Sequence, residues 1–405
     1  MTGKHQGFPR TLLEEPASAR LQYFRGLTVA HPHLVQANEK LLDTIFESPA
    51  NSVVLVYGPT GVGKTTLCMK AQQTLTERFI NDLTADAGRI PVASVEAMAP
   101  ESGNFSWKEH FKVLLAQMDE PLINYKLGAA GKHDHAPHPP FTPDAKAAGS
   151  AYRHAVEQAL RFRNPFAVLI DEAQHLAKMS SGRRLLDQLD VIKSIANRSS
   201  TVHVLFGTYE LLGFRNLSGQ LSRRSVDIHF RRYLAEDDRE RQVFVNVLRS
   251  FEQHLPFPEP PDLAMHWEFL YERSIGCVGI LKEWLTKALS MALKQKATTL
   301  TVKHLESHAA PVAQCDRVLS DALEGERKLV ETAESRSRLR MLLGLPSNTA
   351  SQDDSLEMPR ECGSDAAPGD AGVTVRRPAR RPGVRLPVRD AIGKPEFANA
   401  ASSNI

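Results

Sequence analysis

The sequence predicts an α/β fold in which a parallel sheet is flanked by helices, followed by a small all-helical domain and a disordered tail. Short apolar runs alternate with helical segments between residues 25 and 235, as in parallel sheets covered by helices. From Glu236 to about Leu343 the pattern is helical throughout. Residues 346–405 hold seven prolines and a single aromatic residue, too little apolar area to offset the entropy of ordering the segment.

The elements of the sheet domain follow one another along the chain. We expect strands at 52–58, 89–97, 165–173, 201–208 and 227–233. We expect helices at 64–79, 105–118, 149–163 and 182–197. The first strand, SVVLVYG, is continuously apolar and ends in glycine, as strands buried on both faces do.

These patterns divide the chain into four parts. We expect an N-terminal extension at 1–24, an α/β core at 25–235, a helical domain at 236–345 and the tail at 346–405. Within the core, a segment at about 127–149 reads LGAAGKHDHAPHPPFTPDAKAAG and is too rich in glycine, proline and alanine for a regular element. We therefore expect a loop insertion there.

Composition excludes several classes of protein. The 405 residues are 42% hydrophobic and 24% charged, which excludes a collagen-like or wholly disordered chain. Four scattered cysteines without a CxxC pair argue against a zinc site or a disulfide framework. No apolar run reaches the length of a membrane span and the first residues lack the apolar core of a secretory signal, so we expect a cytoplasmic protein without membrane partners.

The strongest motif is GPTGVGKTT, which matches G-x-x-x-x-G-K-[ST] between a predicted strand and a predicted helix. Its glycines let backbone N–H groups close around phosphates, and the helix N-terminus adds positive potential. We expect Lys64 to reach the β- and γ-phosphates of ATP and Thr65 to place its hydroxyl on Mg²⁺. The predicted phosphate-binding loop consists of Gly58, Pro59, Thr60, Gly61, Val62, Gly63, Lys64, Thr65 and Thr66.

A second motif, FAVLIDEAQHL at 166–176, places two acidic residues at the end of a predicted strand. Asp171 could hold Mg²⁺ opposite the phosphate-binding loop. Glu172 could orient and polarise the attacking water, which favours hydrolysis over transfer of phosphate to another hydroxyl. The alternative is a pair of solvated acids that ends a strand.

Polar residues also stand near the ends of the next two predicted strands. Ligands of doubly wound sheets lie at the carboxyl ends of strands, so Thr208 could contact the γ-phosphate or the attacking water. Arg223 and Arg224 precede the fifth strand. In a ring-forming ATPase, arginines here reach the γ-phosphate of a neighbouring subunit, whereas the alternative is that they lie on the surface or at the sheet edge.

Together these features resemble the AAA+ ATPase family, over about residues 25–310. Within it, the chain looks most like the TniB/TnsC branch of ATP-dependent regulators of Tn7-like DNA transposition. The residues that carry this resemblance are GPTGVGKTT, LIDEAQHL, VLFGTYEL at 204–211, QLSRRS and SIGCVGILKEWLTKAL at 274–289. The resemblance implies a P-loop NTPase sheet with a helical lid, Mg-dependent ATP hydrolysis, and ATP-driven homo-oligomers, rings or spirals, around duplex DNA.

The resemblance also implies partners and residue roles. A target-selection protein would recruit the oligomer, which would hand the site to a transposase and disassemble on ATP hydrolysis. The helix with Lys108 and Lys112 would face the DNA channel, and Arg183 and Arg184 are similar candidates, although all four could be solvated surface residues. Many lids place an arginine on the γ-phosphate, but Gly279 occupies the matching position and Lys282 follows one turn later as a substitute.

Other functions stay open at this point. DEAQHL also occurs in related AAA+ proteins, so a helicase loader, or a secretion or signalling ATPase that binds no DNA, is an alternative. The net charge of +3 requires any nucleic-acid surface to be a local patch. In the tail, residues 376–394 carry six arginines and a lysine, which suit either a solvating linker or an arm that docks on a partner.

Overall fold

The computed structural model describes residues 7–100, 105–123, 145–177, 182–217 and 225–345. The predicted tail at 346–405 lies outside these residues. Among the described residues, no helix is both long and apolar enough to cross a membrane.

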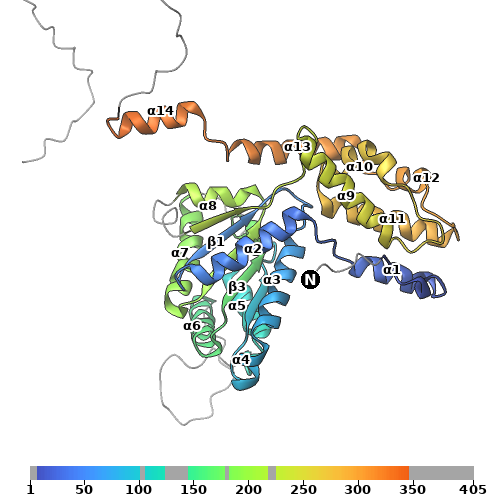
Figure 1. The fold of residues 1–405 in the computed structure, drawn as a ribbon. Coiled ribbons are helices and arrows are strands. Elements are labelled where there is room, and N and C mark those ends of the chain that lie inside the picture. Colours follow the sequence, from blue (N-terminus) through green and yellow to red (C-terminus); the bar gives the residue numbers. More distant parts are fainter. Residues whose placement is uncertain (1–6, 101–104, 124–144, 178–181, 218–224, 346–405) are drawn as a thin grey trace, which may run out of the picture. The chain divides into compact units, whose positions relative to one another are not determined.

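A five-stranded parallel sheet forms the centre of the α/β domain (Figure 1). Its strands, in the order β2-β3-β4-β1-β5, are β1 (Val53–Tyr57), β2 (Val92–Glu96), β3 (Ala167–Asp171), β4 (Val202–Gly207) and β5 (Ser225–His229). The predicted parallel sheet is confirmed. Because all strands run the same way, β1, β3 and β4 end at one edge, and the phosphate-binding motif, the acidic pair and Thr208 each follow one of these ends.

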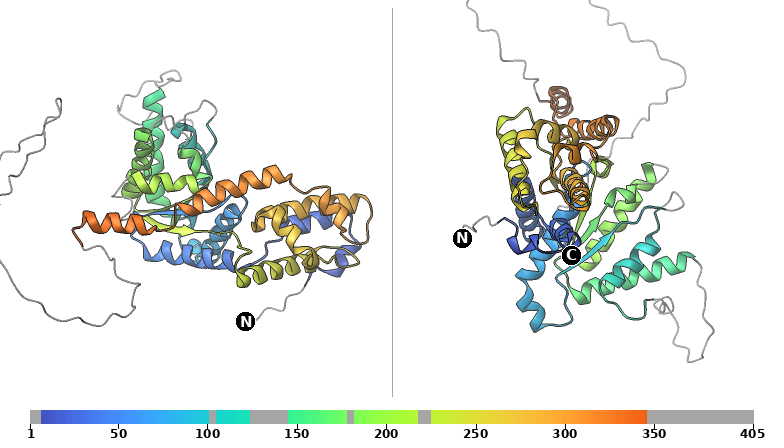
Figure 2. Two further views of the ribbon diagram at one scale, coloured as in Figure 1. Left: turned by 90° about the horizontal axis from the view of Figure 1, so that it is seen from above. Right: turned by 90° about the vertical axis from the view of Figure 1, so that its right-hand side faces the viewer.

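Helices cover both faces of the sheet (Figure 2). They are α2 (Pro32–Glu47), α3 (Lys64–Arg78), α5 (Trp107–Gln117), α6 (Ala145–Arg163), α7 (Gly182–Ser199) and α8 (Leu212–Leu217). The short helix α4 (Ile80–Ala85) follows α3 and has no buried residue. In β1, Val54 and Val56 join the buried cluster that contains residues of α2 and α3, whereas Val53 and Leu55 join the cluster of α5, α6 and α7. This alternation produces three layers.

The helical region after the sheet has its own core. It contains α9 (Asp238–His254), α10 (Trp267–Ser274), α11 (Val278–Lys294), α12 (Val302–Glu306), α13 (Val312–Arg327) and α14 (Ala333–Leu342). Asp237 caps α9, its carboxylate accepting the N–H groups of Arg239 and Glu240. The buried cluster of this region includes Phe244, Leu248 and Leu285. We call this helical region, residues 236–345, the lid.

The N-terminal residues form part of the lid core. Helix α1 (Ala17–Gly26) packs against α11, and Phe24 is fully buried in the lid cluster. Helix α1 therefore spans the predicted boundary between extension and core, and its apolar residues have the lid as their partner.

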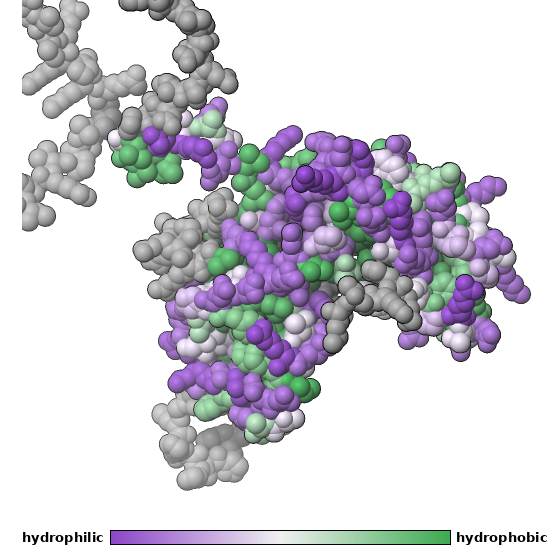
Figure 3. Space-filling view, viewed as in Figure 1, coloured by the Kyte–Doolittle hydropathy of each residue, from purple (hydrophilic) through white to green (hydrophobic). Residues whose placement is uncertain are grey.

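Farther along the chain, α14 presents exposed apolar side chains, among them Met341 and Leu342, and Figure 3 shows apolar atoms gathered on this helix.

Three predicted boundaries are wrong in detail. The fifth strand lies at Ser225–His229 rather than 227–233, because the chain leaves the sheet after His229 and crosses to the lid. The second lies at Val92–Glu96 rather than 89–97. Helix α6 begins at Ala145, so the last residues of the expected loop insertion are helical; residues 124–144 lie outside the described part.

Candidate functional site

The GPTGVGKTT segment forms the turn between β1 and α3, as its pattern predicts. Gly63 has φ +114°, a left-handed conformation that side chains with a Cβ rarely adopt, and it precedes the first residue of α3. A Cβ on Gly58 would lie 2.0 Å from the carbonyl oxygen of Phe230. The loop therefore follows a path that only glycine permits at these positions, with the N-terminus of a 15-residue helix behind it.

Lys64 is buried inside this turn. Its ammonium donates hydrogen bonds to the carbonyl oxygens of Gly58, at 3.1 Å, and Pro59, at 2.8 Å. Burial lowers the pKa of Lys64 to about 8, against the opposing effect of the Glu172 carboxylate, the Cys277 thiol and the Asp171 carboxylate. A positive charge is thus held in a poorly solvated place, where an anionic ligand would stabilise it.

Thr65 and Asp171 line the same cavity. Thr65 is exposed in the first turn of α3, and Asp171 is the buried last residue of β3. A cavity of about 430 Å³ touches both residues and also Ser94 and Glu96 of β2. A hydroxyl and a carboxylate on one cavity are oxygen ligands of the kind that Mg²⁺ prefers, so these residues fit the ion.

Glu172 follows Asp171 in a left-handed backbone conformation, with φ +52°. Its backbone N–H donates to Asp171 Oδ1 at 2.9 Å. Its carboxylate accepts a hydrogen bond from the side chain of Gln174, in the short helix η3 (Ala173–Ala177). The Gln174 side-chain oxygen in turn accepts the backbone N–H of Thr208 at 3.2 Å. The sequence motif contains Gln174, but reasoning from sequence assigned it no role.

Thr208 lies between the end of β4 and the short helix η4 (Tyr209–Leu211). Its side-chain oxygen is buried and has no hydrogen-bond partner among the described residues. A buried hydroxyl without a partner is costly. The cost would be removed by a polar ligand at this edge, which is where the sequence predicts the γ-phosphate.

The lid touches the phosphate-binding loop at the start of α11. The backbone N–H of Ile280 donates to the carbonyl oxygen of Gly61 at 3.1 Å. A Cβ on Gly279 would lie 2.4 Å from that oxygen, so only glycine allows this approach. Gly279 therefore serves close packing of the lid against the loop at the position where many lids carry an arginine.

Lys282 points to the N-terminal segment. Its ammonium donates to the carbonyl oxygen of Arg25 at 2.9 Å, and burial lowers its pKa. Lys282 lines a cavity of about 40 Å³ with Gly63 and Thr66 of the loop and Thr28 and His31 of the N-terminal segment. Sequence reasoning missed residues 28–31; their only signal was the proline at the start of the amphipathic segment 32–47.

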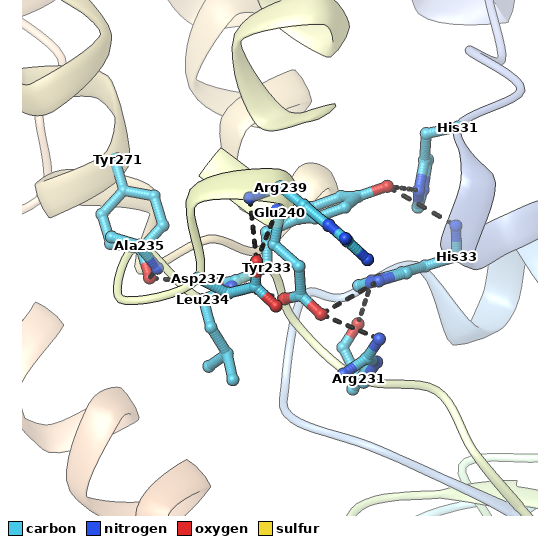
Figure 4. A network of polar contacts seen from close by, with 10 residues as sticks. All are labelled: His31, His33, Arg231, Tyr233, Leu234, Ala235, Asp237, Arg239, Glu240 and Tyr271. Atoms are coloured by element: carbon cyan, nitrogen blue, oxygen red, sulfur yellow. Dashed lines mark hydrogen bonds and ion pairs between the residues drawn. The ribbon is translucent and has the colours of Figure 1, made fainter. Parts of the chain in front are cut away.

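A polar network joins this N-terminal segment to the chain between sheet and lid (Figure 4). The Tyr233 hydroxyl lies 3.0 Å from His31 Nδ1, and the Tyr233 ring stacks on His33 with 4.1 Å between ring centroids. Glu240 pairs with Arg231 at 2.8 Å and accepts the backbone N–H of Leu234. The network thus ties the N-terminal segment to the chain that leads from β5 into α9.

One of the proposed DNA contacts, Lys112, is engaged within the chain. Lys112 pairs with Glu109 at 3.3 Å and lies 5.7 Å from the centre of the Tyr152 ring. Lys108 is half-buried on α5. Arg183 and Arg184 lie in the first turns of α7, where the side chains are not described, and Arg223 and Arg224 lie outside the described residues.

The geometry can now be compared with known proteins. Residues 49–214 match a family model described as an AAA domain. No curated protein matches the chain. Among solved structures, the chain is similar to the Aeropyrum pernix ORC2 protein in its ADPNP–ADP complexes, with 16% identity, a TM-score of 0.46 and coverage of 72% of this chain and 71% of that one.

Two further structures show the same kind of likeness. The Aeropyrum pernix ORC1 protein in complex with DNA has 17% identity and a TM-score of 0.46, covering 80% of this chain and 75% of that one. Domain III of the Thermotoga maritima replication initiation protein DnaA has 15% identity and a TM-score of 0.38, covering 74% and 97%. At these identities the likeness concerns the fold alone.

The sheet order, the phosphate-binding turn and the AAA match define the class of protein. The chain has the P-loop AAA+ fold, with a five-stranded parallel sheet flanked by helices and a helical region that follows it.

Proposed function

We propose that this chain is a Mg-dependent ATPase that assembles with ATP on target duplex DNA and regulates DNA transposition. In this proposal it links a target-selection protein to the transposase and disassembles when ATP is hydrolysed. The observation that carries the ATPase part is that the P-loop, Asp171, Glu172 and Thr208 meet at one edge of the sheet. The transposition part rests on the sequence resemblance to the TniB/TnsC branch.

The residues divide the work of hydrolysis among them. Backbone N–H groups of the loop and the Lys64 ammonium neutralise the phosphates, and Lys64 gains from this because burial disfavours its charge. Glu172 orients the attacking water and accepts its proton. The Thr208 hydroxyl donates to the γ-phosphate or the water and thereby gains the partner that it lacks.

Thr65 and Asp171 would hold the metal. When bound there, Mg²⁺ supplies positive charge that neutralises the β- and γ-phosphate oxygens. The cavity that Thr65 and Asp171 share and the oxygen donors they offer support this assignment. Asp171 Oδ1 accepts the backbone N–H of Glu172 at 2.9 Å, which leaves lone pairs of the carboxylate for an ion.

Oligomerisation would complete the site. Arg223 and Arg224 directly precede β5, and in an oligomer one of them would reach the γ-phosphate of a neighbouring copy. ATPase activity per molecule should then rise with protein concentration, and replacement of the correct arginine should remove this rise while nucleotide binding persists. Activity per molecule that is independent of concentration in both arginine variants and in the wild type would contradict this role.

Electron microscopy with duplex DNA tests the assembly. With a non-hydrolysable ATP analogue we expect rings or spirals on DNA, and with ADP we expect them to be absent. Protein that binds the analogue but stays unassembled on DNA would favour the signalling or secretion alternative. Assemblies that capture a replicative helicase but not the transposase would favour a helicase loader.

The tail is proposed to act in recruitment. Residues 376–394 carry six arginines and a lysine among prolines, and we favour docking on the transposase over binding to DNA. Deletion of residues 346–405 should leave ATP hydrolysis and assembly nearly intact and weaken transposase capture. Normal capture by the truncated protein would contradict the arm.

A further inference from the structure

Gln174 lies between the acidic end of β3 and the end of β4. Its side-chain N–H donates to Glu172 Oε2, and its side-chain oxygen accepts the backbone N–H of Thr208 at 3.2 Å. The side chain is only 6% exposed, so water does not compete for these bonds. Both ends of one buried amide are thus committed to residues that the proposed function places at the γ-phosphate.

The chemistry of its neighbours fixes the direction of this amide. The backbone N–H of Thr208 is a donor and needs an acceptor, which is the Gln174 oxygen. The Glu172 carboxylate only accepts, so it needs the NH₂ group. An acid at position 174 could satisfy Thr208 but would place a second carboxylate against Glu172.

The backbone around Gln174 is shaped to make both bonds. A Cβ on Gly207 would lie 2.7 Å from the Gln174 side-chain oxygen, so the glycine at the end of β4 leaves room for the amide. Glu172 has a left-handed φ of +52°, a conformation that is costly for a residue other than glycine. The His175 N–H bonds to the Glu172 carbonyl oxygen at 3.0 Å and closes the turn that carries Gln174 back toward Glu172.

We propose that Gln174 is a positioning residue, which holds the Glu172 carboxylate in place for the attacking water and ties it to Thr208. This inference rests on the proposed ATPase function. Because Thr208 is held through its backbone, any shift of the β4 end on phosphate binding moves the amide that fixes Glu172. Gln174 therefore acts through Glu172 and touches neither phosphate nor metal in this assignment.

Two substitutions separate positioning from packing. Gln174→Met keeps nearly the same volume but loses both hydrogen bonds, and Gln174→Glu keeps the acceptor for Thr208 but loses the donor to Glu172. We expect each to lower kcat by roughly 10–100-fold while KM for ATP changes by less than about threefold, the size of effect seen when a supporting hydrogen bond is removed from a reactive group. Gln295→Met in the lid, where the exposed Gln295 side chain contacts His304, makes the same substitution outside the site and should keep wild-type kcat.

A double-mutant cycle gives the readout that a packing role would not move. In the Glu172→Gln background, Gln174→Met should cause no further loss of hydrolysis, because the group it positions is already gone. Steady-state ATPase assays and nucleotide titrations of the four proteins measure this. Wild-type kcat in Gln174→Met, or losses that simply add in the double mutant, would overturn the inference alone. Absence of ATP hydrolysis by the wild-type protein would overturn the proposed function and this inference with it.

Discussion

The Lys64 ammonium is a positive charge in a buried, poorly solvated site. Its ammonium bonds to two loop carbonyl oxygens, and burial lowers its pKa to about 8. A phosphate beside it would restore the stabilisation that burial removes. At the residue scale, stabilisation of the buried Lys64 charge by phosphate is the physical basis for nucleotide binding in the proposed function.

Replacing Lys64 by alanine tests whether its charge contributes to phosphate binding. We expect Lys64→Ala to weaken ATP binding by about 10–100-fold or more, because a charge-assisted contact to phosphate is lost. Calorimetric titration with ATP measures the change. Lys70→Ala removes a lysine from the exposed side of the same helix and should leave the affinity unchanged. Equal affinities in wild type and Lys64→Ala would show that the loop does not bind the phosphates.

The sequence predicts the positions and roles of some site residues but not of others. The loop motif places Lys64 and Thr65 because fixed spacing after a strand dictates their positions. Gln174 could not be assigned, since only the fold brings the backbone N–H of Thr208, 34 residues away, to the side chain that also contacts Glu172. Thr28 and His31 were missed for the same reason: only the fold brings them beside Gly63.

The contact between α11 and the phosphate-binding loop belongs to the scale of elements. Gly61 and Ile280 share a backbone hydrogen bond, and Gly279 leaves no space for a larger residue. A second contact joins the lid to the chain that leaves β5: Arg232 makes a two-point ion pair with Glu326 of α13, at 2.9 and 3.1 Å. The lid is thus fastened to the α/β domain by close backbone packing and by a largely buried ion pair.

A methyl group at position 279 should disturb this packing. Gly279→Ala would push its Cβ toward the Gly61 oxygen, so we expect a loss of about 1–3 kcal/mol in stability and faster exchange of the Ile280 amide, which donates to that oxygen. Thermal unfolding and hydrogen exchange measure both effects. Gly26→Ala, where nothing lies near the added methyl, is the control. Unchanged exchange in Gly279→Ala would contradict the tight contact.

Helices and strands could be predicted only where the local sequence has a clear hydrophobic pattern. Strands β1, β3 and β4 were predicted because buried parallel strands are continuous apolar runs. Helix α1 was not predicted, since its apolar residues have a partner, α11, that lies more than 250 residues away in the sequence. The end of β5 was misplaced because Phe230 and Tyr233 are buried aromatic residues, as in a strand, but they lie where the chain crosses to the lid.

Across the whole molecule, buried histidines link stability to pH. Burial lowers the pKa of His31, His110 and His203 to about 4, with neighbouring histidines adding to the effect for His31 and His110. In the unfolded chain each would titrate near its ordinary value of about 6.5. The folded state therefore holds them neutral, and their full contribution to stability is present above about pH 6.5.

Acid should unfold the protein through these residues. As pH falls from about 6.5 to about 4, each histidine should lower the free energy of unfolding by about 1.4 kcal/mol per pH unit, because only the unfolded state binds the proton. Urea titrations between pH 7 and 5 measure the slope. His203→Asn should give a shallower slope than the wild type, because it removes one of the buried imidazoles. A stability independent of pH over this range would contradict the linkage.

In the proposed function, Glu172 is required for hydrolysis of bound ATP, and a single-turnover assay tests this role most directly. Wild-type protein and Glu172→Gln are mixed with a small amount of labelled ATP and Mg²⁺, and binding and phosphate release are followed together. We expect Glu172→Gln to bind ATP within about threefold of wild type and to release phosphate at least about 100-fold more slowly, since the amide is nearly isosteric but cannot accept a proton. Phosphate release near the wild-type rate by this variant, at full occupancy, would contradict the account.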